Sequence, residues 1–201
     1  MPPKTTGDIK NAIKDSLREL LCDEEFIGNL LAKVEEKLAT FQKTVDKHTD
    51  AIRILEEKMD KVQQNEKVNN ICVYNLPEEQ DRDTREIFIQ LCKDKMNIKI
   101  PQENIATCYR VGKVSEKPRP VIIKFQQYAA KKLVLKNVYK LKGTKVGIAE
   151  DLTKNRLILY RSAQELTYKQ SVFTRYGNIY VKINEKVHKI PDVKSMKNLI
   201  E

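Results

Sequence analysis

The clearest chemical feature of this sequence is a block of cations between residues 101 and 148. The block holds 11 Lys and Arg residues against only two carboxylates, those of Glu103 and Glu116. Cations at this density attract a polyanion, most often nucleic acid. The alternative is a solvated basic surface that only keeps the protein in solution. We favour phosphate binding, because the excess of positive charge is confined to one part of the chain.

The balance of charge changes near residue 70. Residues 1–69 carry 12 basic and 14 acidic side chains, a net charge of −2. Residues 70–201 carry 26 basic and 14 acidic side chains, a net charge of +12. We therefore expect a polyanionic partner to bind the second part of the chain.

Aromatic stacking on bases is the other chemistry that the sequence suggests, but the usual stacking positions hold no aromatic residue. The stretch NICVYNLP (70–77) has the pattern of the first strand of an RNA-recognition domain, in which one aromatic ring stacks on a base. Cys72 occupies that position, and the strand RPVIIKF puts Pro120 and Ile122 in the other two stacking positions. Since a stacked base contributes about 1–3 kcal/mol, we expect the sheet to serve as a scaffold for a basic rim.

Metal binding and catalysis have no matching pattern. The four cysteines (Cys22, Cys72, Cys92, Cys108) form no CxxC pair, and His48 and His188 are far apart, whereas a zinc site needs about four clustered ligands. We expect reduced cysteines in an intracellular protein of the cytoplasm, the nucleus or both. Neither a Ser/His/Asp set nor a Gly-rich phosphate loop is present, so we expect no enzyme and no cofactor. No apolar run approaches the ~18 residues of a membrane span.

Residues 26–66 carry the strongest structural pattern, an apolar stripe whose steps alternate between four and three residues. This period predicts a left-handed coiled coil, and so narrow a stripe has nothing to bury against except another helix. His48 would form a polar layer, and both a trimer and a dimer remain possible. The predicted oligomerisation residues are Ile27, Leu31, Val34, Leu38, Phe41, Val45, His48, Ile52, Leu55, Met59 and Val62.

A helical segment is expected to precede the coil over residues 1–25. The stretch Cys22-Asp23-Glu24-Glu25 resembles a break between two helices. Asp23 is the predicted N-cap of the second helix, with two glutamates favourable in its first turn.

After residue 69 the period changes, and residues 70–150 predict the order βαββαβ, the ferredoxin-like architecture of RNA-recognition domains. Asp83 or Thr84 would cap its first helix. Residues 151–201 predict a small basic α/β subdomain: a helix capped by Asp151 or Thr153, a hairpin turning at Gly177-Asn178, a short strand and a last helix. The expected fold class is α+β. The tyrosines of this subdomain are weaker candidates for stacking: Tyr160, Tyr168, Tyr176 and Tyr180.

A self-associating coil, a βαββαβ unit and a basic C-terminal subdomain, in this order, resemble the first-open-reading-frame protein of LINE-type retrotransposons. The chain is equally similar to the few-polyhedra (FP) protein family of baculoviruses and its insect-genome relatives. The resemblance spans residues 26–200. It rests on the order and spacing of the segments NNICVYNLPE, IATCYRVGK, RPVIIKF, LKGTKVGIAEDLT and RYGNIYVKI.

The resemblance implies a homotrimer that coats single-stranded nucleic acid, mainly RNA, and acts as a chaperone of strand annealing. It also implies that arginines hold the phosphates. Matched by motif, these are Arg110 in CYRVGK, Arg119 before VIIKF and Arg161 on the helix after EDLT.

The leading hypothesis is therefore a coiled-coil oligomer that places several basic surfaces on one single strand of RNA or DNA. The predicted nucleic-acid-binding residues are Arg110, Lys113, Lys117, Arg119, Lys124, Lys131, Lys132, Lys140, Lys142, Lys145, Arg156 and Arg161. The alternative, which follows the baculovirus resemblance, is a viral or virus-derived assembly factor that acts through protein contacts.

Overall fold

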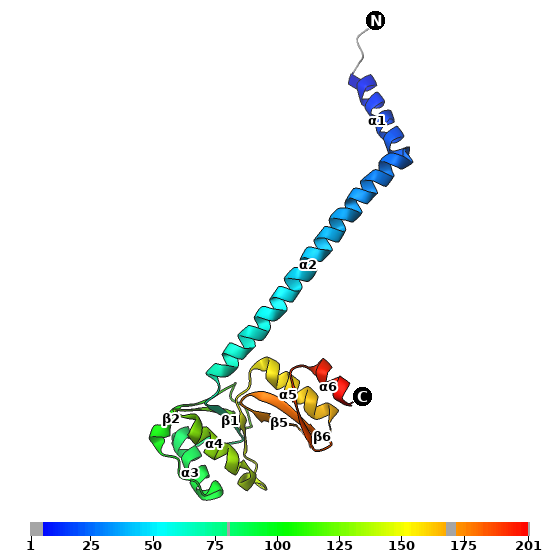
Figure 1. Cartoon of the computed structure of the whole chain (residues 1–201). Helices are drawn as coiled ribbons and strands as arrows, with labels where there is room; N and C mark the ends of the chain where they lie inside the picture. The colour runs from blue at the N-terminus through cyan, green and yellow to red at the C-terminus, as the bar shows by residue number, and fades with distance from the viewer. Residues whose placement is uncertain (1–5, 80, 168–171, 201) are drawn as a thin grey trace. The chain divides into compact units, whose positions relative to one another are not determined.

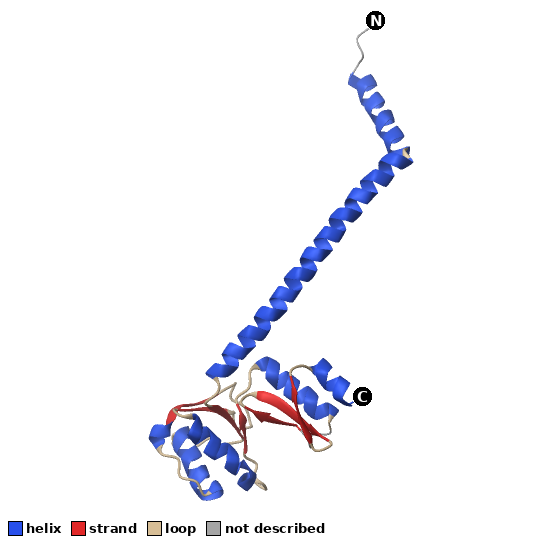
Figure 2. Ribbon diagram, in the orientation of Figure 1, coloured by secondary structure: helices blue, strands red, loops and turns tan. Residues whose placement is uncertain are grey.

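The computed structural model describes residues 6–79, 81–167 and 172–200 (Figure 1). The chain divides into two units, Met1–Glu57 and Lys58–Glu201. The described part of the first unit is helical, whereas the second unit combines helices with two antiparallel sheets (Figure 2). This mixture confirms the α+β class. The predicted domain boundaries at residues 25, 66 and 150 remain predictions.

Two helices precede the sheets, α1 (Thr6–Cys22) and α2 (Glu24–Glu66). Asp23 separates them, and its carboxylate accepts hydrogen bonds from the backbone N–H groups of Glu25 at 3.0 Å and Phe26 at 3.2 Å. Asp23 is therefore the N-cap of α2, and the prediction is confirmed. The apolar stripe along α2 is largely exposed in the single chain, including Leu38, Phe41 and Leu55.

The first sheet has four strands in the order β2-β3-β1-β4, and each neighbouring pair is antiparallel. Two α-helices and two 3-10 turns connect them, which gives the predicted order βαββαβ. The elements are β1 (Asn70–Tyr74), α3 (Thr84–Met96), η1 (Gln102–Asn104), β2 (Ile105–Arg110), β3 (Val121–Phe125), α4 (Tyr128–Asn137), η2 (Val138–Leu141) and β4 (Gly147–Glu150).

The helices cover one face of this sheet, and the alternation of side chains on the strands explains why. Ile71 and Val73 of β1 and Ile123 of β3 are fully buried in one core with Phe88 of α3. A register shift in β2 between Ile105 and Thr107 interrupts its alternation. As a result Ile105 and Cys108 both pack on the helix-covered side, and the strand changes face at a point that simple alternation does not predict.

The helix ends follow local capping chemistry. Asp83 caps α3 by accepting a hydrogen bond from the backbone N–H of Arg85 at 2.9 Å, as one of the two predictions had it. Thr153 caps α5 (Lys154–Leu166) through its hydroxyl, which accepts from the backbone N–H of Arg156.

The second sheet is a meander of β5 (Val172–Arg175), β6 (Asn178–Ile183) and β7 (Lys186–Ile190). Helices α5 and α6 (Val193–Ile200) lie against one face of it, where Leu159 and Met196 pack on the strands (Figure 1). The predicted hairpin turn at Gly177-Asn178 is wrong by one residue, because the turn residues are Tyr176 and Gly177. Both have positive φ, 53° and 70°, as the favoured two-residue hairpin turn requires.

A network of buried and half-buried polar groups, here called the polar junction, ties the C-terminal end of α2 to both sheets. The Gln64 side chain donates to the carbonyl of Asp151 at 2.8 Å and accepts from the backbone N–H of Thr153 at 2.9 Å. Asp60 forms an ion pair with Arg156 at 2.7 Å. The junction consists of Asp60, Gln64, Lys67, Asn70, Lys131, Glu150, Asp151, Thr153, Arg156 and Gly177. The last turns of α2 are thus part of the second unit.

Candidate nucleic-acid interface

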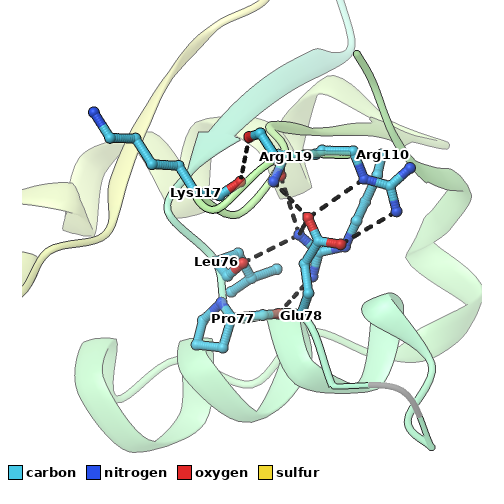
Figure 3. A network of polar contacts seen from close by, with 7 residues as sticks. Leu76, Pro77, Glu78, Arg110, Lys117 and Arg119 are labelled. Atoms are coloured by element: carbon cyan, nitrogen blue, oxygen red, sulfur yellow. Dashed lines mark hydrogen bonds and ion pairs between the residues drawn. The ribbon is translucent and has the colours of Figure 1, made fainter. Parts of the chain in front are cut away.

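The two motif arginines of the four-stranded sheet are held by contacts inside the protein. Arg110 donates to the carbonyl oxygens of Leu76 at 3.1 Å, Arg119 at 3.0 Å and Pro77, and its side chain is only 8% exposed. Figure 3 shows Glu78 between Arg110 and Arg119. Its carboxylate lies 3.2 Å from Arg119 and 3.6 Å from Arg110. The cluster therefore fixes the ends of three strands and retains a net charge of about one.

Glu78 is stabilised as an anion by these contacts. The backbone N–H of Arg119 donates to it, as does the Arg119 side chain, and these hydrogen bonds lower the pKa of the carboxyl group. The charge of Arg110 acts in the same direction.

Three further predicted residues are also engaged inside the fold. Lys131 is 1% exposed, donates to the carbonyl of Val68 at 2.8 Å and forms an ion pair with Glu150 at 3.1 Å. Arg156 belongs to the polar junction. Lys140 is half-buried and donates to the carbonyl of Met96 at 2.7 Å. We leave these three out of the candidate interface.

The remaining predicted residues are exposed, and four of them gather at one edge of the first sheet. The exposed set is Lys113, Lys117, Lys124, Lys132, Lys142, Lys145 and Arg161. Strands β1 and β2 end at this edge, and β3 and β4 begin there, because all pairs are antiparallel. The two loops at this edge, 111–120 and 142–146, carry four exposed lysines, here called the lysine edge: Lys113, Lys117, Lys142 and Lys145.

Two contacts show that these loops flank the end of β1. The Asn75 side chain donates to the carbonyl of Lys145 at 2.9 Å on one side. Glu78 accepts from the backbone N–H of Arg119 on the other side. The lysine edge is therefore a property of the folded sheet. Lys132 lies apart from it, on α4.

The face of the sheet that turns away from the helices adjoins the lysine edge and carries two exposed rings that the sequence analysis missed. Tyr109 on β2 is 51% exposed and Tyr74 on β1 is 39% exposed. Tyr109 pairs with Ile122, and Ile122 pairs with Cys72, so the rings neighbour the three empty stacking positions. Simple alternation from the buried Ile105 would place Tyr109 on the helix-covered side, and the register shift in β2 reverses this.

The two rings stand on strands separated by β3, a distance of about 10 Å at ~4.8 Å per strand. Each ring can therefore serve a separate base. The charge of Arg161 on α5 also influences one of these rings, Tyr74. Burial and the hydrogen bond with Cys72 raise the pKa of the Tyr74 hydroxyl, whereas the charge of Arg161 opposes this shift. The positive charge of one predicted arginine thus acts on Tyr74.

The cysteines are free, and three of them are poorly suited to nucleophilic chemistry. All four lie among the described residues without a disulfide. Burial raises the pKa of the Cys72 and Cys92 thiols, and it raises the pKa of Cys108 to about 11, so the reactive thiolate is scarce at neutral pH.

Within residues 6–79, 81–167 and 172–200, no group of three His, Cys, Asp or Glu side chains gathers as a metal site would need. None of the described helices is both long enough and apolar enough to cross a membrane. A scan of the chain against models of known protein families finds no match.

Proposed function

We propose that this protein binds single-stranded nucleic acid, mainly RNA, as a coiled-coil oligomer. One observation carries the proposal. Four exposed lysines lie on the loops at one edge of a sheet whose adjoining face exposes Tyr74 and Tyr109. Cations that follow a backbone, together with rings on which bases stack, are the two parts of a single-strand binding surface. Lys124 is exposed on β3, two residues after Ile122, and the charge of Arg161 acts on Tyr74.

We further propose that residues 70–150 are an atypical RNA-recognition domain. The order βαββαβ, the strand order β2-β3-β1-β4 and the two helices on one face support this assignment. Its stacking rings would be displaced from the usual positions: Tyr74 lies two residues after Cys72 on β1, and Tyr109 lies beside Ile122 on β2. A resemblance to the retrotransposon first-open-reading-frame proteins and the baculovirus FP family is part of the same proposal.

The oligomer is supported by the exposed stripe of α2. Burying about ten large apolar side chains against another helix would be strongly favourable, at ~1.5–3 kcal/mol for each fully buried side chain. We favour a trimer over a dimer from the family resemblance. Light-scattering mass tests the oligomer with two neighbouring changes. Leu55→Glu, on the stripe, would dissociate it, whereas Ile54→Glu, off the stripe and also exposed, would leave the mass unchanged.

The binding proposal is tested by anisotropy of a labelled uridine strand over a salt series. We expect the logarithm of the association constant to fall linearly with the logarithm of salt concentration. Replacing Lys113, Lys117 and Lys145 by Gln should reduce that slope by about 2, at ~0.7 per phosphate contact.

A matched control removes the same charge elsewhere. Lys93, Lys95 and Lys99 are also exposed and lie at or after the end of α3. Their replacement by Gln should leave the slope close to that of the unaltered chain. A flat salt dependence of the unaltered chain, or the absence of binding, would refute the function.

A further inference from the structure

Among the described residues, no helix packs on the second face of the second sheet, and the proposed interface does not include this face. Helices α5 and α6 lie against one side of this sheet, through Ile179, Val181 and Ile190 of the strands. The alternate residues of the strands point to the other side. They include Phe173, Arg175, Tyr180, Lys182, Val187 and Lys189.

A pair of stacked rings lies at the centre of this uncovered side. Phe173 and Tyr180 are direct partners across β5 and β6, with ring centroids 5.6 Å apart and planes inclined by 15°. Phe173 is 40% exposed, because the described core of this sheet lies on the other side. Lys189 stands opposite Tyr180 on β7, so one row across the sheet reads ring, ring, cation.

The charge around the rings has one sign. Arg175 and Lys182 occupy the neighbouring positions on β5 and β6, and both are exposed. Among the described strand residues of this side, no carboxylate is present. Glu185 in the β6–β7 turn pairs with Lys182 at 2.5 Å. That ion pair is solvent-exposed and such pairs contribute little.

We propose that Phe173, Tyr180, Arg175, Lys182 and Lys189, here called the ring face, bind bases and phosphates of single-stranded nucleic acid. A nucleotide carries one flat aromatic base and one negative charge, and the ring face offers flat rings with cations beside them. Stacking of this kind accepts any base, because every base has a π face. An acidic peptide would use the cations but not the planes of the rings. The inference rests on the proposed function for its ligand, and it adds a second contact surface to each protomer.

The ring face is tested with two double variants of the full chain. Phe173→Leu with Tyr180→Val removes both rings while keeping apolar strand residues. Phe173→Tyr with Tyr180→Phe keeps both rings and is the matched control. The probes are a labelled uridine strand and a strand of the same length with abasic sites, which keeps the phosphates and lacks the bases.

We expect removal of the rings to weaken binding of the uridine strand about tenfold, within the contribution of one stacked base. The slope with salt should not change, because no charge is lost. The control variant should bind the uridine strand as the unaltered chain does, and all three proteins should bind the abasic strand equally. Equal binding of the uridine strand by all three would overturn the inference, as would equal weakening on both strands.

Because a cross-strand aromatic pair also stabilises its sheet, a second measurement uses the unaltered chain alone. A strand that contains 4-thiouridine is cross-linked by light, and the linked peptides are identified by mass spectrometry. Links at Phe173 or Tyr180 support the ring face. Links confined to Tyr74, Tyr109 and the lysine edge overturn it and leave the proposed function intact. If the unaltered chain binds no strand at all, the proposed function fails and the inference fails with it.

Discussion

The polar junction and the lysine edge use basic side chains in opposite ways. In the polar junction, Lys131 and Arg156 each face a carboxylate, and Lys131 is closed off from solvent. At the lysine edge, Lys113, Lys117 and their neighbours extend from loops into solvent. A buried cation is part of the fold, because leaving its partner alone costs several kcal/mol. An exposed cation costs the fold little and remains available to a phosphate.

The positive charge of the block 101–148 therefore serves two tasks. Arg110 and Arg119, which the family motif suggested as phosphate ligands, share Glu78 and fix the ends of three strands (Figure 3). The lysines on the two loops at the edge of the sheet supply the exposed charge. The arginines therefore hold the surface in shape, and we expect the lysines to carry most of the salt dependence.

The largest effect is expected from breaking the buried pair of Lys131 and Glu150. Lys131→Met keeps most of the side-chain volume and leaves the Glu150 carboxylate buried without its cation. We expect the free energy of unfolding to fall by about 3–5 kcal/mol, the usual cost of breaking a buried ion pair by removing one partner. Urea denaturation followed by circular dichroism measures it.

The neighbouring lysine provides the control for this change. Lys132 is exposed on the same helix, so Lys132→Met should change the stability by no more than about 0.5 kcal/mol. Similar stabilities for the two variants would mean that the polar junction does not depend on the Lys131 charge.

A smaller effect is expected at Gly177, where the hairpin turn approaches the end of α2. A Cβ built at this position would lie 2.6 Å from three atoms of the Gln64 side chain. Gln64 cannot easily move, because both ends of its amide are hydrogen-bonded in the polar junction. Gly177→Ala should therefore destabilise the protein through both its positive φ and this overlap.

Gly143→Ala separates the two causes. Gly143 has a φ of 89°, and a Cβ there would meet nothing within 4 Å. Both variants should lose about 1–2 kcal/mol from the left-handed backbone. Gly177→Ala should lose about 1–3 kcal/mol more, the usual cost of overpacking. Thermal unfolding of both variants measures the difference. Equal losses of stability would show that the overlap with Gln64 does not destabilise the Gly177→Ala variant.

The sequence was sufficient wherever the pattern is local. The stripe of α2, the break at Asp23 and the caps at Asp83 and Thr153 depend on residues within one or two helical turns of each other. The order βαββαβ follows from the same periodicities. The hairpin turn was misplaced by one residue because Tyr176 itself adopts positive φ, which is uncommon for a residue of its size.

The division of the cations into buried and exposed groups could not be predicted in the same way. Lys131 meets Glu150, 19 residues later, and Arg156 meets Asp60 on another element, so these partners are set by tertiary packing. One signal was present for Lys131, since it precedes Val134 and Val138 at helical spacing on the packed side of α4 and η2. For Tyr109 the face was set by the register shift in β2, which has no signature in the sequence.

The smallest effect is expected at Glu78, a carboxylate that pairs with Arg110 and Arg119 inside the protein yet lies beside the lysine edge. Its hydrogen bonds with Arg119 lower its pKa in the folded protein. The folded state therefore holds the proton less tightly than the unfolded state near the ordinary Glu pKa of about 4.3. The stabilisation is fully present above that pKa and is lost as the pH falls through the lower folded-state pKa.

Glu78→Gln tests this expectation, because the amide can still accept the hydrogen bond from the Arg119 backbone while the charge is removed. We expect the variant to be less stable than the unaltered chain at neutral pH, with a difference that shrinks on acidification through the pKa of Glu78. Glu79→Gln, which removes the adjacent exposed carboxylate, controls for net charge. Unfolding midpoints of the three proteins over an acid pH series measure the effect. A difference that grows on acidification would mean that Glu78 does not bind the arginines as an anion, and the loop 111–120 would then lack this support.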